Sequence, residues 1–154
     1  MRTCRIGVIS DTHGLLRPEV DACLSGVSHI IHAGDIGRPE VMTGLRRIAP
    51  VTAIRGNVDN GGWAEEYPYT QTLTLAGRSF HVLHDLNDLQ LNAALGGIDV
   101  VISGHSHRCR VEVVESVLYL NPGSAGPRRF KLPVTMATLD LREDGMEPMI
   151  HRLL

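Results

Sequence analysis

Side chains that commonly bind metal ions follow several short hydrophobic runs in this 154-residue sequence. The first three runs end in Ser-Asp-Thr-His (residues 10–13), His-Ala-Gly-Asp (32–35) and Arg-Gly-Asn (55–57). Two later runs end in Leu-His-Asp (83–85) and Ser-Gly-His-Ser-His (103–107). In open α/β sheets, ligands bind beyond the carboxyl ends of the strands. We therefore expect these segments to converge on one site.

Seven of these residues carry oxygen or imidazole ligands: Asp11, His13, Asp35, Asn57, His84, His105 and His107. Such a mixed set suits manganese, iron, zinc, cobalt or nickel better than calcium or magnesium. Seven side chains are too many for one ion but suit two ions that share a carboxylate. Two ions about 3.5–4 Å apart clamp the attacking and leaving oxygens of an in-line displacement at phosphorus. The spacing therefore predicts a dinuclear site for phosphoryl chemistry.

The expected charge of this site favours an anionic substrate. Two divalent ions, the carboxylates of Asp11 and Asp35 and one bridging hydroxide sum to about +1, which attracts a phosphate group. The whole chain has 15 Lys and Arg against 17 Asp and Glu, a net charge of −2. This balance excludes the strongly basic profile of a dedicated nucleic-acid binder. Aromatic residues make up only 4% of the chain, which weighs against base-stacking platforms.

Four further histidines lie outside these motifs: His29, His32, His81 and His151. A single histidine on an apolar segment is more often structural than a ligand, so we expect these four to be structural. Of these four, His32 lies near a predicted ligand, since it precedes Asp35 by three residues.

The elements that must position the site follow from hydrophobic spacing. Strands are predicted at residues 6–9, 30–31 and 51–54, with helices starting near Pro18 and Pro39, and this β-α-β-α-β order is typical of a parallel sheet. A hairpin over residues 70–84, a helix over 86–95 and a buried strand at 100–102 follow. The remaining strand-like runs predict a mixed or antiparallel second half: 111–113, 117–120, 134–141 and 149–153. The length predicts one α/β domain spanning residues 1–154.

At these motifs the sequence resembles the calcineurin-like metallophosphoesterase superfamily, and within it the small bacterial and archaeal phosphodiesterases of the YfcE type. The resemblance runs from residue 6 to about residue 141 and includes Asn-Pro-Gly-Ser at 121–124. It implies a metallo-dependent phosphatase-like fold, a four-layer α/β/β/α sandwich of two mixed sheets. It also implies a division of the ligands: Asp11, His13 and His107 on one metal, Asn57, His84 and His105 on the other, and Asp35 bridging.

The function expected from the residues and the resemblance is a dinuclear metal-dependent phosphodiesterase. A metal-bridging hydroxide would attack phosphorus in line. The residues expected to act most directly in catalysis are Asp11, Asp35, Asn57 and His84. Manganese is the first expectation for both metal ions, with nickel, cobalt, zinc or iron as alternatives.

Two positions depart from patterns common in the superfamily. Val58 stands where many larger phosphatases have a histidine that can protonate the leaving group, so diesters with good leaving groups are favoured. Asp85 stands where the small phosphodiesterases usually have glycine. We expect Asp85 to cap the helix that follows; the alternative is that it orients a metal ligand.

Two further residues are expected to support the site. Asp59 is predicted to hydrogen-bond a metal-binding histidine. Arg128 is predicted to contact substrate phosphate, since guanidinium matches phosphate geometry. The alternative for Arg128 and its neighbour Arg129 is a solvated basic pair after a turn.

The rival hypothesis is a protein-binding scaffold, because the retromer subunit Vps29 resembles this fold but has lost key ligands. All seven predicted ligands are present here, which favours catalysis. No apolar run approaches the ~20 residues of a membrane helix, and no signal-peptide core is visible. Cys4, Cys23 and Cys109 form no Cys-x-x-Cys pair. We therefore expect a cytoplasmic protein that acts on a small phosphodiester without membrane or nucleic-acid partners, and we leave a homo-oligomer, a dimer or larger, open.

Overall fold

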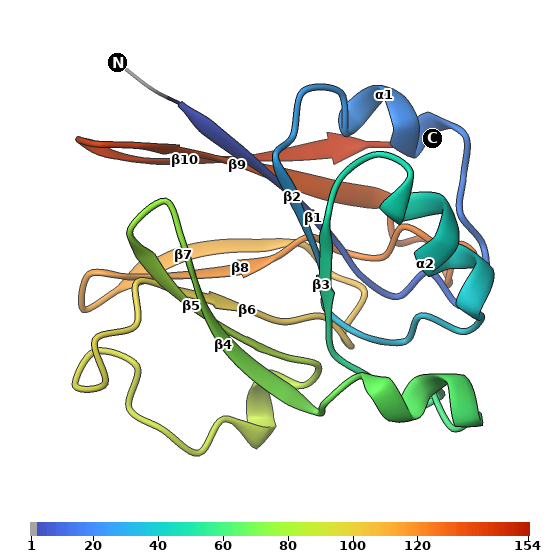
Figure 1. The fold of residues 1–154 in the computed structure, drawn as a ribbon, viewed down its shortest axis with the longest axis horizontal. Helices are drawn as coiled ribbons and strands as arrows, with labels where there is room; N and C mark the ends of the chain where they lie inside the picture. Colours follow the sequence, from blue (N-terminus) through green and yellow to red (C-terminus); the bar gives the residue numbers. More distant parts are fainter. Residues whose placement is uncertain (1–2) are drawn as a thin grey trace.

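Two five-stranded sheets form the body of the molecule in the computed structural model, which describes residues 3–154 (Figure 1). The first sheet has the strand order β10-β9-β1-β2-β3, in which β1, β2 and β3 are parallel and β9 and β10 are antiparallel to their neighbours. Its strands are β1 (Cys4–Ile9), β2 (His29–His32), β3 (Val51–Ala53), β9 (Thr135–Arg142) and β10 (Gly145–Arg152).

The second sheet has the strand order β4-β5-β6-β8-β7. Its centre, β5-β6-β8, is parallel, and antiparallel pairs β4-β5 and β7-β8 flank it. Both sheets are therefore mixed, as the sequence predicted. The strands are β4 (Thr70–Leu75), β5 (Arg78–Leu83), β6 (Val100–Ile102), β7 (Arg110–Val114) and β8 (Val117–Asn121).

Alternation along the strands divides the buried hydrophobic residues among three clusters. Ile6, Val8 and Ile31 point between the sheets and pack in one cluster with Phe80 and Val100 of the second sheet. Neighbouring residues on the same strands point to the opposite face, because successive strand side chains alternate. The inner cluster holds the two sheets together, and one outer cluster lies beneath the two helices. The other outer cluster joins the second sheet to the segment that contains Ala93 and Ile98.

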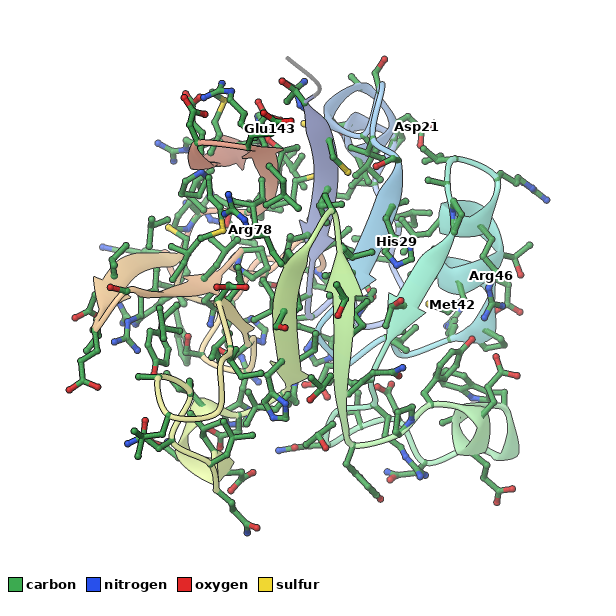
Figure 2. The ribbon with its side chains drawn as sticks, turned by 60° about the vertical axis from the view of Figure 1, so that its left-hand side comes forward. Asp21, His29, Met42, Arg46, Arg78 and Glu143 are labelled. Atoms are coloured by element: carbon green, nitrogen blue, oxygen red, sulfur yellow. The ribbon has the colours of Figure 1, made fainter. Side chains whose placement is uncertain are left out.

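Two α-helices cover the outer face of the first sheet: α1 (Glu19–Cys23) and α2 (Pro39–Arg46). Pro39 is the first residue of α2, where its missing N–H costs nothing. Val41, Met42 and Leu45 form its buried face, and Figure 2 shows Met42 and Arg46 on this helix. Within residues 3–154, no helix is long and apolar enough to cross a membrane.

The outer layer on the second sheet differs from the prediction. The expected helix over residues 86–95 is wrong: a single 3₁₀ turn, η2 (Leu86–Asp88), is followed by turns. Within this segment a side chain competes with the helical hydrogen bonds, since Asn92 Oδ1 accepts the Leu95 N–H. The four-layer α/β/β/α sandwich is therefore present in part, with a loop where the fourth, helical layer was expected.

The segment between β3 and β4 contains the short 3₁₀ helix η1 (Gly62–Glu66). The strands predicted in the second half of the chain are present as β7, β8, β9 and β10.

Gly7 lies at a close contact between β1 and the first helical segment. A Cβ built on Gly7 would overlap the Cδ2 atom of Leu24, which is completely buried. We predict that Gly7→Ala lowers the free energy of unfolding by about 1–3 kcal/mol, because overpacking forces neighbouring side chains to shift. Urea unfolding would measure this. Gly145→Ala is the matched control: its Cβ would meet nothing within 4 Å, and an equal loss there would contradict the packing argument.

Candidate metal centre

The predicted ligands extend from the carboxyl ends of strands in both sheets. Asp11 and His13 follow β1, Asp35 follows β2 and Asn57 follows β3 in the first sheet. His84 follows β5 in the second sheet, and the two remaining histidines follow β6. The site therefore lies where the two sheets meet, and neither sheet supplies it alone.

Asp11 lies at the centre of the cluster, and its side chain is completely buried. Its Oδ2 accepts hydrogen bonds from the Ser10 hydroxyl at 2.7 Å and from the backbone N–H of His105 at 3.0 Å. Its Oδ1 lies 3.3 Å from His107 Nε2, 3.7 Å from His13 Nε2 and 3.8 Å from His84 Nε2. One oxygen is thus fixed by the protein, and the other faces three imidazoles.

Asp35 joins the same cluster from the neighbouring strand. Its Oδ2 lies 3.1 Å from His84 Nε2 and 3.6 Å from His13 Nε2, and its Oδ1 accepts the Val58 N–H at 3.1 Å. Two groups of three could each hold a metal ion: Asp11, His13 and His107, and Asp11, Asp35 and His84. Asp11 belongs to both groups, and Asp35 lies beside a histidine of each.

Several atoms of this cluster are buried without a hydrogen-bond partner. They are Asp11 Oδ1, His13 Nε2, His84 Nε2 and His107 Nδ1. An unpaired buried polar atom costs about 1–3 kcal/mol. Carboxylate oxygens and imidazole nitrogens are also the ligands that first-row transition metals prefer. The donor set therefore fits divalent cations.

The tautomer of His84 follows from its other contact. Its Nδ1 lies 2.7 Å from the Ala33 carbonyl oxygen, which can only accept, so Nδ1 carries the hydrogen in the neutral ring. The Nε2 lone pair then faces the carboxylates of Asp11 and Asp35. A hydrogen bond of this kind to the second ring nitrogen is the usual way in which proteins orient a metal-binding histidine.

The carboxylates of the cluster also favour positively charged groups beside them. Burial disfavours charged His84, yet Asp35 and the Ala33 carbonyl raise its pKa to about 9. Burial likewise opposes ionisation of Asp11, yet the neighbouring His107 and His13 lower the pKa of Asp11 far below its ordinary value. The contact with Asp11 raises the pKa of His13. The carboxylates thus attract cations, which can be protons or metal ions, and metal binding would release those protons.

The backbone at the ligands is unusual. Five of the seven predicted ligands have positive φ angles between 47° and 71°: Asp11, His13, Asp35, His105 and His107. Residues other than glycine rarely adopt this left-handed region, which costs of order 1–3 kcal/mol each and concentrates at functional sites. Aspartate and histidine tolerate it better than most residues. The motifs combine ligand chemistry with residues that can make these turns.

Asn57 and His105 lie at the edge of the cluster. Asn57 is exposed and lines a hollow with His84. The His105 ring centroid is 5.1 Å from that of His84, and its side chain is 42% exposed. The structure thus gathers five predicted ligands tightly and places these two at the rim, on the His84 side.

Asp59 does not contact a histidine through its side-chain hydrogen bonds, so its expected role differs from what the structure shows. Its carboxylate accepts backbone N–H groups from Ile36, Gly37 and Gly56. These contacts tie the loop after β2 to the loop after β3. Asp59 therefore supports the positions of Asp35 and Asn57 through the backbone.

His32 has the structural role expected for it. The Thr12 hydroxyl donates to the Ile36 carbonyl oxygen, so His32 Nε2 donates to that hydroxyl, and His32 Nδ1 accepts the Gly34 N–H. Burial lowers the pKa of His32 to about 4, so the ring is neutral. Both ring nitrogens are occupied, and neither is free for a metal.

The Asn-Pro-Gly-Ser segment supports the site, a role that sequence reasoning did not assign. Ser124 Oγ donates to the Asp11 carbonyl oxygen at 3.0 Å, and Asn121 Nδ2 donates to the Gly104 carbonyl oxygen at 2.9 Å. The segment connects the backbone after β1 to the backbone after β6. The motif itself was the only signal available in the sequence.

The remaining two predicted site residues lie on opposite sides of the cluster. Asp85 caps η2 as expected, and its Oδ2 also lies 3.7 Å from His105 Nε2. Arg128 is exposed and lines a hollow with Arg129, His13 and His107. This position is compatible with a contact between Arg128 and a bound phosphate.

Comparison with known proteins agrees with this geometry. Residues 4–144 match the calcineurin-like phosphoesterase superfamily domain. A probable metallophosphoesterase from Methanothermobacter thermautotrophicus is 36% identical over 152 residues, which cover 91% of this chain and 86% of that protein. Among solved structures, an archaeal phosphodiesterase is similar, with a TM-score of 0.78 and 25% identity over 96% of this chain and 99% of that one.

The scaffold Vps29 is also similar in structure. Vps29 from Entamoeba histolytica, solved in complex with zinc, has a TM-score of 0.72 and 20% identity over 97% of this chain and 99% of that one. At this identity the likeness concerns the fold alone. The family match over most of the chain and the buried Asp and His cluster agree, and the chain belongs to the calcineurin-like phosphoesterase superfamily.

Proposed function

We propose that this protein is a dinuclear metal-dependent phosphodiesterase that acts on a small phosphodiester. The observation that carries the proposal is the set of unpartnered ligand atoms around Asp11, at the strand ends of a member of a phosphoesterase family. Manganese is the first candidate for both ions, and nickel, cobalt, zinc or iron share the ligand preferences.

The residues that would hold the metals are the seven named from the sequence: Asp11, His13, Asp35, Asn57, His84, His105 and His107. When bound, two divalent ions supply an ionised water at neutral pH and charge neutralisation on the phosphate. Asp35, which lies beside both His13 and His84, holds the two halves of the site at a fixed separation. The hydrogen bond to Ala33 fixes the His84 ring.

The chemistry of the leaving group favours diesters. The Val58 side chain is 47% exposed beside Asn57 and cannot donate a proton. The leaving alkoxide or phenolate must therefore depart unprotonated or take a proton from solvent, which suits good leaving groups. Arg128 would hold a phosphate oxygen on the His13 side of the cluster.

Hydrolysis of bis-p-nitrophenyl phosphate tests the proposal directly. We expect metal-stripped protein to be inactive and to gain diesterase activity when Mn²⁺ is added, with slower hydrolysis of p-nitrophenyl phosphate. Activity that survives exhaustive chelation would contradict the metal mechanism. Bound metal without hydrolysis of any diester, with Mn²⁺, Ni²⁺, Co²⁺ or Zn²⁺, would favour the scaffold alternative.

Asp35→Ala should lose metal and activity together. Removing a group that only hydrogen-bonds to a metal ligand typically lowers metal affinity or activity 10–100-fold. Asp35 is itself a proposed ligand, so its removal should lower both by about 100-fold or more. Calorimetric titration with Mn²⁺ and the diesterase rate measure the two effects. Asp21→Asn is the control, since Asp21 is an exposed acid on α1 (Figure 2). Full activity in Asp35→Ala would refute the assignment.

Arg128→Ala should weaken substrate binding more than it slows turnover. Losing one guanidinium–phosphate contact is expected to raise KM about tenfold, with a smaller change in kcat. Steady-state kinetics on bis-p-nitrophenyl phosphate would separate the two constants. Arg47→Ala, an exposed arginine just after α2, is the charge-matched control. A KM equal to that of the control would assign Arg128 to the solvated surface.

Exposed valines on the second sheet favour the scaffold alternative. The edge strand β7 carries exposed valines, with Val111 48%, Val113 67% and Val114 42% exposed. Exposed apolar side chains on an edge strand can bind a partner. The metal-binding and diesterase measurements above decide between a scaffold with a structural metal and an enzyme.

A further inference from the structure

The Asp85 carboxylate lies beside the rim of the metal centre, directly after His84. Its Oδ1 accepts the Asn87 N–H at 3.0 Å, which fixes the side chain at the start of η2. Its Oδ2 lies 3.7 Å from His105 Nε2. The cap thus accounts for one oxygen, and the other faces the site.

Two hollows flank this side of the cluster, and Asp85 is the residue common to both. The first has a volume of about 190 Å³ and is lined by Asn57, His84 and Arg55, among others. The second has a volume of about 420 Å³ and includes His105 and Arg108. A substrate group that occupies either hollow therefore meets the Asp85 carboxylate.

Three arginines line the two hollows, Arg55, Arg108 and Arg110, and none of them forms an ion pair with Asp85 in the described part of the chain. Arg55 lies over the Tyr69 ring, with its guanidinium carbon 4.2 Å from the ring centroid. Arg110, in the second hollow, is paired with Glu112. In the described part of the chain, the only basic group within 4.0 Å of the Asp85 carboxylate is His105. By contrast, no carboxylate lines the hollow formed by His13, His107, Pro127, Arg128 and Arg129.

We propose that Asp85 is a charge filter that makes this centre prefer singly charged phosphodiesters to doubly charged phosphate monoesters. This inference rests on the proposed function and deepens it. A phosphate monoester carries close to two negative charges at neutral pH, because its second pKa is about 6, whereas a diester carries one. A fixed carboxylate at the rim of the centre repels a phosphate held at the metals, and this repulsion grows with each additional negative charge.

The filter acts independently of the leaving group. The lack of a proton donor at Val58 slows the departure of poor leaving groups from either class of ester, and this effect is on rate. Asp85 disfavours monoesters by repulsion, and this effect is on binding of any dianion, including inorganic phosphate. The two causes are therefore separable by a measurement that involves no turnover.

Asp85→Asn removes the charge and retains an oxygen that can accept the Asn87 N–H. At about pH 8, where phosphate is mainly the dianion, we expect this variant to bind inorganic phosphate about tenfold more tightly when loaded with Mn²⁺. Its kcat/KM for p-nitrophenyl phosphate should rise by a similar factor, and that for bis-p-nitrophenyl phosphate, which carries half the charge, by only about threefold. Calorimetry gives the phosphate and Mn²⁺ affinities.

Asp88→Asn is the matched control, because Asp88 lies on the same 3₁₀ turn and lines only the first of the two hollows. Unchanged phosphate affinity in Asp85→Asn, or an equal gain in Asp88→Asn, would overturn the filter. The same carboxylate attracts Mn²⁺, so phosphate affinity is measured at saturating Mn²⁺. A loss of Mn²⁺ affinity in Asp85→Asn without a gain in phosphate affinity would also overturn the filter, since Asp85 would then act by orienting His105. The wild-type diesterase rate tests the proposed function, and phosphate affinity tests the filter, so the two failures are distinguishable.

Discussion

The arrangement of the site depends on how the Asp11 carboxylate is held. One oxygen receives hydrogen bonds from Ser10 and from the backbone of His105, and the other is left facing the imidazoles of His13, His84 and His107. The first set of contacts makes the residue rigid. The second leaves a buried oxygen unpaired, at a cost that a cation can remove. Asp11 thus links the local structure of β1 to the chemistry of the centre.

This arrangement requires both sheets to be packed. Asp11 and Asp35 come from the first sheet, and His84 and His107 from the second. The apolar cluster between the sheets provides the favourable free energy that opposes gathering buried carboxylates and several left-handed residues at one edge. Stability is thus concentrated between the sheets, and strain is concentrated at their carboxyl ends. Metal binding would satisfy the unpaired ligand atoms and would couple the centre to the stability of the fold.

The sequence allowed the strands and the convergence of the ligands to be predicted, because strand periodicity and ligand type are local properties. The helix over residues 86–95 was wrong because hydrophobic spacing was counted without the competing side-chain hydrogen bond of Asn92. The contacts of Asp59 were not predictable, since its three partners are backbone N–H groups, two of them on a distant loop. Residue types do not indicate which backbone N–H groups a carboxylate will bind.

Residues 56–59 show how geometry and selectivity can be separated within one motif. The Val58 N–H donates to Asp35, and the Asp59 carboxylate receives the Gly56 N–H, so the backbone of this turn helps hold the ligands. The Val58 side chain takes no part in that backbone hydrogen bond and lies exposed beside Asn57. A different side chain at position 58 could therefore change which leaving groups are accepted while the backbone contact to Asp35 is retained. Asp85 is divided in the same way: one carboxylate oxygen caps η2, and the other faces His105 at the rim of the site. In both cases a structural contact fixes a group whose remaining surface is free to set substrate preference.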